Sequence, residues 1–138
     1  MTDSTTGARL IRGKEVQTVA SPGLELAIGV SAETAGSKTL LFGRFTARPG
    51  SRVPPHQHTC ETAAYLVSGR VVINAGEALG ERFELEPGDY VYVGAGVIHD
   101  EETVGDEDAV LMMARDQQGG ERIAVNPSDP GWALLEGE

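Results

Sequence analysis

Short runs of alternating or continuous apolar residues, separated by turn residues, fill most of the chain from residue 24 to residue 125. Alternation with a period of two is typical of half-buried strands, and unbroken apolar runs are typical of strands buried on both faces. The pattern predicts strands at residues 24–28, 38–47, 62–67, 70–74, 81–86, 90–93, 97–104, 109–115 and 122–125, and one more around His56 and His58. The segment at residues 122–125 has the weakest pattern.

Several strands carry finer predictions. Residues 109–115 are apolar on both faces, which is typical of a central strand. Phe83 and Leu85 alternate with charged residues, so we expect both to point inward. Ser68 and Gly69 predict a tight hairpin turn, and Gly43 indicates a bulge.

Composition supports one β domain. The chain has 138 residues, 40% of them hydrophobic, with 18 glycines and 7 prolines. This length suits a single domain, and many turn residues between short strands favour an antiparallel sandwich or barrel over a helical bundle. We expect Gly50, Gly69, Gly88 and Gly96 to be turn residues that need unusual φ angles.

Charge and cysteine content exclude some functions. The net charge of −10 argues against nucleic acid or an anionic membrane as a partner. The acidic run at residues 100–108 predicts a solvated hairpin loop. The single cysteine excludes an internal disulfide, and no stretch has the length and apolarity of a signal peptide or membrane span. We therefore expect a cytoplasmic protein.

The three histidines of the chain lie in two short segments, residues 50–69 and 88–100. His56 and His58 are two residues apart, so in a strand both side chains point to one face and can reach one ion. His99 follows a second glycine-rich turn and supplies a third imidazole from a separate hairpin. Neutral imidazole is the commonest protein ligand of transition metals, so the sequence predicts a divalent metal site.

These residues resemble the two motifs of a cupin, a small metal-binding jelly roll. The matching positions of the first motif are Gly50, His56, His58 and Gly69, and those of the second are Gly88, Gly96 and His99. Gly94 replaces the usual proline and Thr103 the usual asparagine. The resemblance implies an all-β, antiparallel double-sheet jelly-roll barrel. We expect an N-terminal arm at residues 1–20, the barrel at 21–126, and a tail at 127–138 that packs on the barrel, with Trp132 as its anchor.

The fourth ligand is where the sequence departs most from this family. Thr62 stands where the motif has glutamate, and Glu61 lies one residue too early. A shift of one residue reverses the facing of a strand side chain, so Glu61 reaches the metal only across a bulge. Cys60 shares the facing of Thr62 and is a rival ligand, because thiolates bind zinc and iron. Glu61, Cys60 or neither therefore completes the three-histidine set.

Other candidate residues have weaker support. Tyr65 and Arg44 are candidates for contact with a substrate, and Arg52 and Arg70 are further candidates to hold an anionic one. For the arginines, solvated surface charge is the competing interpretation.

Three hypotheses for function follow. The first is a non-haem Fe(II) dioxygenase acting on a small molecule, since cupins include three-histidine dioxygenases. The second keeps a metal such as Zn, Ni or Mn as a Lewis acid in a cyclase, isomerase or decarboxylase. The third is a non-catalytic metal- and ligand-binding module. The resemblance also implies a homodimer, paired through sheet faces.

Overall fold

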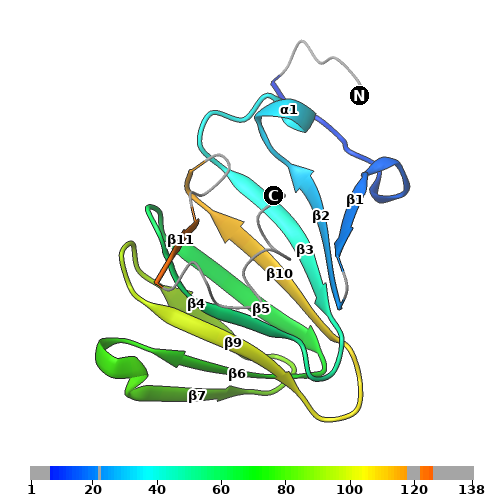
Figure 1. The fold of residues 1–138 in the computed structure, drawn as a ribbon. Coiled ribbons are helices and arrows are strands. Elements are labelled where there is room, and N and C mark those ends of the chain that lie inside the picture. The colour runs from blue at the N-terminus through cyan, green and yellow to red at the C-terminus, as the bar shows by residue number, and fades with distance from the viewer. Residues whose placement is uncertain (1–6, 22, 118–121, 126–138) are drawn as a thin grey trace.

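Two antiparallel β-sheets pack face to face in the computed structural model of the chain, which describes residues 7–21, 23–117 and 122–125 (Figure 1). One sheet has the order β1 (Thr18–Ser21), β2 (Leu24–Val30), β3 (Leu41–Ala47), β10 (Ala109–Arg115), β5 (Thr62–Ser68) and β8 (Tyr90–Val93). The other has the order β11 (Arg122–Ala124), β4 (Arg52–His58), β9 (His99–Val104), β6 (Arg70–Ala75) and β7 (Glu81–Leu85). The predicted all-β jelly roll is confirmed.

Helical structure is confined to short connections in the described part of the chain: η1 (Gly13–Glu15), α1 (Ala32–Ala35) and η2 (Glu77–Leu79). The single turn of α1 is capped by Ser31, whose side chain accepts a hydrogen bond from the Thr34 backbone. None of the described helices is both long and apolar enough to cross a membrane.

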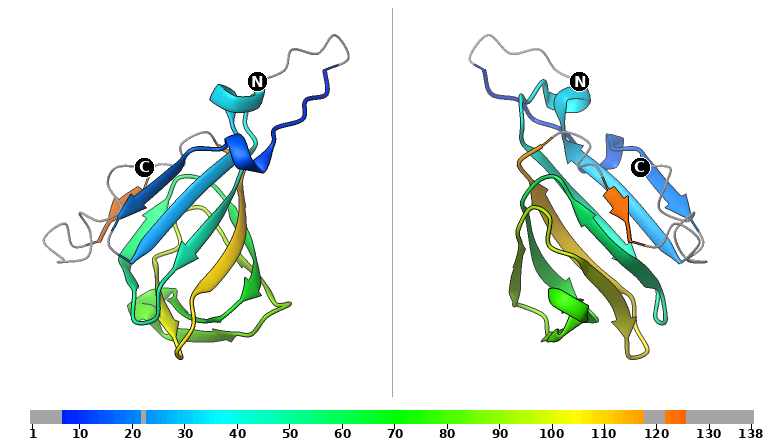
Figure 2. Two further views of the ribbon diagram at one scale, coloured as in Figure 1. Left: turned by 90° about the vertical axis from the view of Figure 1, so that its right-hand side faces the viewer. Right: turned by 60° about the vertical axis from the view of Figure 1, so that its left-hand side comes forward.

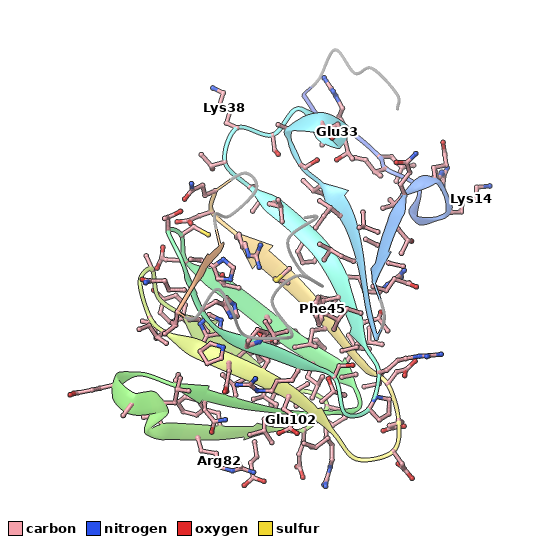
Figure 3. All side chains as sticks on the ribbon, viewed as in Figure 1. Lys14, Glu33, Lys38, Phe45, Arg82 and Glu102 are labelled. Atoms are coloured by element: carbon pink, nitrogen blue, oxygen red, sulfur yellow. The ribbon has the colours of Figure 1, made fainter. Side chains whose placement is uncertain are left out.

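The hydrophobic core fills the space between the two sheets, which face each other across the molecule (Figure 2). Its main buried cluster is made of Leu66, Val71, Ile73, Leu85, Ala109 and Leu111. Phe45 packs against both this cluster and a smaller one around Val53, whereas Lys38 and Arg82 project outward (Figure 3). Both sheets thus bury one face against the other, as in other β-sandwiches.

Most predicted strands are present, and β10 lies centrally between β3 and β5 as expected. Three finer predictions were wrong. β5 and β6 belong to different sheets, so Ser68 and Gly69 turn the chain from one sheet to the other and do not close a hairpin. Phe83 is 43% exposed, because β7 is an edge strand that buries Leu85 but not its neighbour two residues earlier. The acidic run at 100–108 is not a loop throughout, since residues 100–104 belong to β9 and Asp100 is buried.

The sheet begins before the expected start of the barrel. β1 pairs with β2 from Thr18 onward, so the last residues of the expected arm at 1–20 form an edge strand of the six-stranded sheet. The expected tail at 127–138, including Trp132, lies outside the described residues.

Candidate metal centre

A bulge in β4 sets the direction of the two neighbouring histidines. Val53 pairs with Glu101 and His56 pairs with His99, so Pro54 and Pro55 together oppose one residue of β9. Proline cannot donate to the ladder, which suits it to such an irregular position. The extra residue changes the facing of the strand, and Val53, His56 and His58 consequently all line the same cavity.

His56, His58 and His99 form one buried cluster. Their exposed fractions are 2%, 5% and 2%, and one ligand nitrogen from each lies within 4.8 Å of those of the other two. His56 and His99 are directly opposite across the β4–β9 ladder, and their ring centroids are 4.2 Å apart. Cross-strand pairing therefore brings together residues that are 43 positions apart in the chain, counting from 56 to 99.

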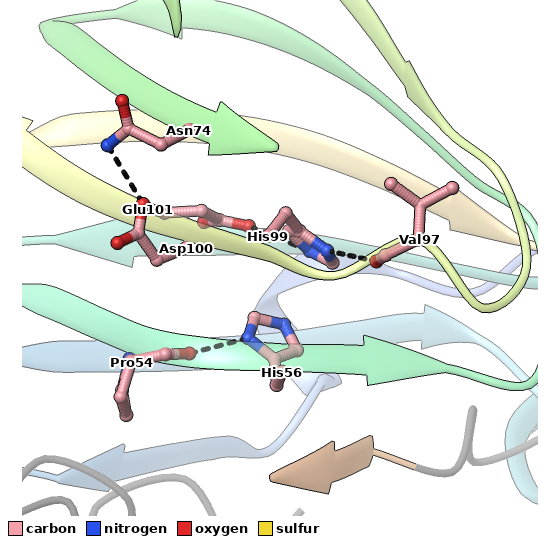
Figure 4. A network of polar contacts seen from close by, with 7 residues as sticks. All are labelled: Pro54, His56, Asn74, Val97, His99, Asp100 and Glu101. Atoms are coloured by element: carbon pink, nitrogen blue, oxygen red, sulfur yellow. Dashed lines mark hydrogen bonds and ion pairs between the residues drawn. The ribbon is translucent and has the colours of Figure 1, made fainter. Parts of the chain in front are cut away.

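Backbone carbonyls fix the tautomers of two of the rings. Nδ1 of His56 lies 2.8 Å from the carbonyl oxygen of Pro54, and Nδ1 of His99 lies 3.0 Å from that of Val97 (Figure 4). A carbonyl oxygen can only accept, so each Nδ1 carries the proton and donates it. The Nε2 atom of each ring is then the one with a lone pair, as a metal ligand requires.

Backbone hydrogen bonds join the two histidine segments. The Gly96 amide donates to the carbonyl oxygen of His58 at 2.9 Å, and the Gly50 amide donates to that of Thr103 at 2.8 Å. Gly50 and Gly96 have φ angles of 83° and 78°, so both turns use a conformation that favours glycine, as predicted.

The cluster opens into a cavity of about 50 Å³ between the sheets. Polar groups at the histidine end meet apolar side chains that continue into the hydrophobic core. The lining residues are Phe45, Val53, His56, His58, Thr62, Ala64, Ile73, Val91, Val93, His99, Glu101, Leu111, Met113 and Arg115. The space can hold an ion with a small ligand, and its apolar wall limits the access of water.

The structure places Glu61 and Cys60 outside this cavity lining. Glu61 is exposed, and its carboxylate accepts a hydrogen bond from the Tyr92 hydroxyl, which raises the pKa of Tyr92. Cys60 is buried, and burial raises the pKa of its thiol although the Arg115 guanidinium opposes the shift. Among the described residues, the grouped ligand atoms come from the three histidines.

Glu101 is a carboxylate near the cluster that the sequence analysis missed. It lines the cavity, and its Oε1 lies 3.9 Å from Nε2 of His99 (Figure 4). The signal was available: Glu101 is two residues after His99 on one strand, the same relation that pairs His56 with His58. Its place in an acidic run led instead to the prediction of a solvated loop.

Thr62 and Arg115 also line the cavity, from the opposite sheet. Thr62 keeps the position of the motif's glutamate but offers a hydroxyl. Arg115 was not among the predicted site residues. Its facing matches that of Leu111 and Met113 on β10, which could have indicated an inward cation.

The other candidate residues lie elsewhere. Tyr65 packs against Tyr90 with ring centroids 4.8 Å apart, and Arg44 is exposed. Arg52 forms an ion pair with Asp100 at 3.5 Å, and Arg70 forms one with Glu86 at 3.3 Å. None of Tyr65, Arg44, Arg52 and Arg70 is among the described residues that line the cavity.

The three histidines fit a metal ion. Imidazole–metal bonds of about 2.0–2.1 Å place two ligand atoms at most about 4.2 Å apart. The ligand atoms here lie within 4.8 Å of one another, so each ring needs to move only slightly to close the set. The fixed tautomers and the burial of all three rings suit this role.

A double-sheet jelly roll with three buried histidines on two neighbouring strands, β4 and β9, defines a class of β-barrel metal-binding proteins. The chain belongs to the cupin family: the model of the cupin domain matches residues 43–115. No curated protein matches the chain.

Solved structures share this fold. The polyketide cyclase RemF from Streptomyces resistomycificus is 18% identical over 91% of this chain and 90% of its own, with a TM-score of 0.73. KdgF from Halomonas sp. is 18% identical over 81% of this chain and 96% of its own, with a TM-score of 0.67. Oxalate decarboxylase from Bacillus subtilis is 25% identical over 83% of this chain, with a TM-score of 0.71, but only 31% of that longer protein is matched.

Proposed function

We propose that this chain is a metal-dependent enzyme that acts on a small organic molecule in the cavity between the sheets. The observation that carries the proposal is the cluster of three buried imidazoles at one end of an apolar cavity. Three protein ligands leave coordination positions open for substrate, which distinguishes catalytic from structural metal sites. The fixed rings hold the ion, and the apolar wall excludes bulk water.

Iron(II) is the metal we favour, with the chemistry of a non-haem dioxygenase. When bound, a redox-active metal with open positions supplies the reactivity of oxygenases. Three neutral imidazoles, with or without one carboxylate, leave coordination positions open on such a metal, so this choice holds whether or not Glu101 is a ligand.

The second candidate is a redox-neutral cyclase or decarboxylase, in which the metal supplies Lewis acidity. The names of two similar structures, a polyketide cyclase and an oxalate decarboxylase, favour it.

We further propose that Glu101 supplies the carboxylate of the site. Its Oε1 is within 3.9 Å of His99 Nε2, a separation compatible with two ligands of one ion. It follows His99 on the same strand, so it needs no bulge to face the cavity.

Elemental analysis of protein purified without added metal tests the proposal. We expect bound metal in the wild type and its loss in the His56→Ala/His99→Ala variant. Gln57→Ala is the matched control, because Gln57 lies between two of the histidines but outside the cavity lining. Full metal content in the double variant would contradict the ligand assignment.

Turnover of a panel of metabolites, compared in air and under nitrogen, separates the two reactions. Oxygen uptake that matches product formation supports the dioxygenase, and anaerobic turnover with zinc supports the Lewis-acid enzyme. Metal binding without turnover of any metabolite would contradict both enzymes and favour the third hypothesis, a non-catalytic binding module.

A further inference from the structure

Two buried polar atoms in the cavity wall make no hydrogen bond of ordinary geometry among the described residues: Oγ1 of Thr62 and Nε of Arg115. The Thr62 hydroxyl does lie near the Cys60 thiol and partly offsets the rise in the pKa of that thiol, so Nε of Arg115 is the stronger sign of a missing acceptor. Both residues line the cavity. Buried donors are almost always paired in native proteins, and an exception points to a water, an ion or a ligand. Arginine Nε is a donor only and stays charged, so its missing partner is an acceptor, preferably an anion.

The two residues are direct neighbours across a β-ladder. Thr62 of β5 pairs with Arg115 of β10 in the antiparallel register. Side chains of such a pair stand on one face of the sheet with Cβ atoms about 4.5–5.5 Å apart. A hydroxyl and a guanidinium N–H are therefore presented side by side, a spacing that suits the two oxygens of one carboxylate.

The position of this pair relative to the histidines is also informative. Thr62 occupies the motif position of a metal-binding glutamate, yet it carries no charge. His56, His58 and His99 come from the five-stranded sheet, whereas Thr62 and Arg115 come from the six-stranded sheet. A small molecule in the cavity would thus meet the metal on one side and the pair on the other.

The charges in the cavity favour an anionic occupant. Among the described lining residues, Glu101 and Arg115 are the ones that carry charge with histidines neutral, and their charges cancel. A divalent cation at the histidines then leaves two positive charges in a largely apolar space. An anion that offsets this charge is favoured strongly where water is scarce.

We propose that Thr62 and Arg115 form a subsite for the carboxylate group of a small organic acid. The carboxylate accepts one hydrogen bond from the Thr62 hydroxyl and one from Nε of Arg115, beside the position at which the family places its glutamate. The substrate class of the enzyme is then a small carboxylic acid or carboxylate-bearing metabolite. The subsite proposal rests on the proposed function in one respect only, the presence of a metal ion at the nearby histidines.

Calorimetric titration of zinc-loaded protein with short carboxylates, each compared with its neutral amide, tests the subsite. We expect the wild type to prefer the carboxylate by about tenfold or more. Arg115→Met should remove most of that preference, leaving the part due to the zinc ion, and Thr62→Val, which keeps the shape and removes the hydroxyl, should reduce it. Arg44→Met is the matched control, since Arg44 is an exposed cation of the same sheet whose strand also pairs with β10.

Equal affinity for carboxylate and amide in the wild type, or an unchanged preference in both Arg115→Met and Thr62→Val, would overturn the subsite and leave the two atoms as sites of ordinary hydration. Circular dichroism establishes that each variant is folded, and elemental analysis gives the metal content of the same samples. A protein that retains metal but shows no carboxylate preference contradicts the subsite alone. A protein without metal whose carboxylate preference still depends on Arg115 contradicts the proposed function alone.

Discussion

His56 and His99 hold their rings in the same way, although one follows a bulge and the other a glycine turn. In both, Nδ1 donates to the carbonyl oxygen two residues earlier in the chain. The Pro54 carbonyl is available for this bond because the register of β4 and β9 shifts at that point. Local backbone geometry thus selects the tautomer and leaves Nε2 as the atom of each ring that could bind a metal.

The two carboxylates near the histidine segments make a sharp residue-scale test. We expect Glu101→Gln to weaken metal retention by about tenfold or more, because an amide is a poorer ligand than a carboxylate. Glu61→Gln should leave metal affinity unchanged, since Glu61 is exposed and bonded to Tyr92. Competition with a chromophoric chelator measures both affinities. Weakening by the Glu61 substitution alone would make Glu61 the fourth ligand, one residue before the position of the motif's glutamate.

Residue spacing was sufficient to find the histidines but not the rest of the cavity wall. The three imidazoles stand out because an i, i+2 pair and a distant third histidine are rare together. Glu101 and Arg115 carry residue types that are mostly exposed, so composition argued against an inward position. Only the strand pairing shows that Glu101 has the facing of the buried His99, and that Arg115 has the facing of the buried Leu111.

At the scale of the elements, two glycines of the first motif are required for different physical reasons. Gly69 has φ of 84°, and a Cβ there would lie 2.6 Å from Cα of Ala109 and also clash with the Asp108 carbonyl. Gly50 has φ of 83°, but nothing lies within 4 Å of its Cβ position. The first is required by packing of the β5–β6 turn, and the second by backbone conformation alone.

Substitution by alanine separates these two effects. We expect Gly69→Ala to lower the free energy of unfolding by about 3 kcal/mol, from strain and backbone overlap together. Gly50→Ala should lower it by about 1 kcal/mol, the strain of a left-handed residue. Urea unfolding in the presence of a chelator, with unchanged m-values, measures both differences. Equal losses in the two variants would mean that the turn yields to the added methyl group.

Strand positions could be predicted from the chain, but register could not. Turn residues mark most strand ends, and the order of apolar positions identified β10 as central. The bulge at Pro54 and Pro55 depends on pairing with β9, a strand far along the sequence. The exposure of Phe83 likewise depends on β7 lying at a sheet edge, which the alternation of its own residues does not reveal.

At the scale of the whole molecule, each of the two sheets contributes different residues to the candidate site. The five-stranded sheet carries the histidines and Glu101, and the six-stranded sheet carries Thr62 and Arg115. Across β3, β10, β5 and β8, the outer face of the six-stranded sheet carries mostly apolar and aromatic side chains. One row across it consists of Phe42, Ala114, Ala63 and Tyr92, and the next consists of Arg44, Met112, Tyr65 and Tyr90.

We propose that a second copy of the chain covers this outer face, as the resemblance to paired jelly rolls led us to expect. Tyr90 is 80% exposed, Tyr92 is 64% exposed, and Val67 of β5, next to the buried Leu66, is 47% exposed. Contiguous apolar surface of this kind marks interaction sites. In a dimer with a two-fold axis, both copies use the same face, so the interface is self-complementary. Aromatic residues are enriched at protein interfaces. Pairing there would leave the cavity, on the other side of the sheet, free to bind substrate.

Light scattering coupled to size exclusion tests the dimer. We expect twice the mass of the chain for the wild type and the mass of one chain for Val67→Glu/Tyr90→Glu. Each new carboxylate would be buried near the same carboxylate of the second copy, where the two repel each other and lose their hydration. Phe83→Glu is the control, since it places the same charge on an exposed apolar residue of the other sheet. A wild type that elutes as a single chain contradicts the proposal, and a dimer lost only in the Phe83 variant would move the interface to the five-stranded sheet.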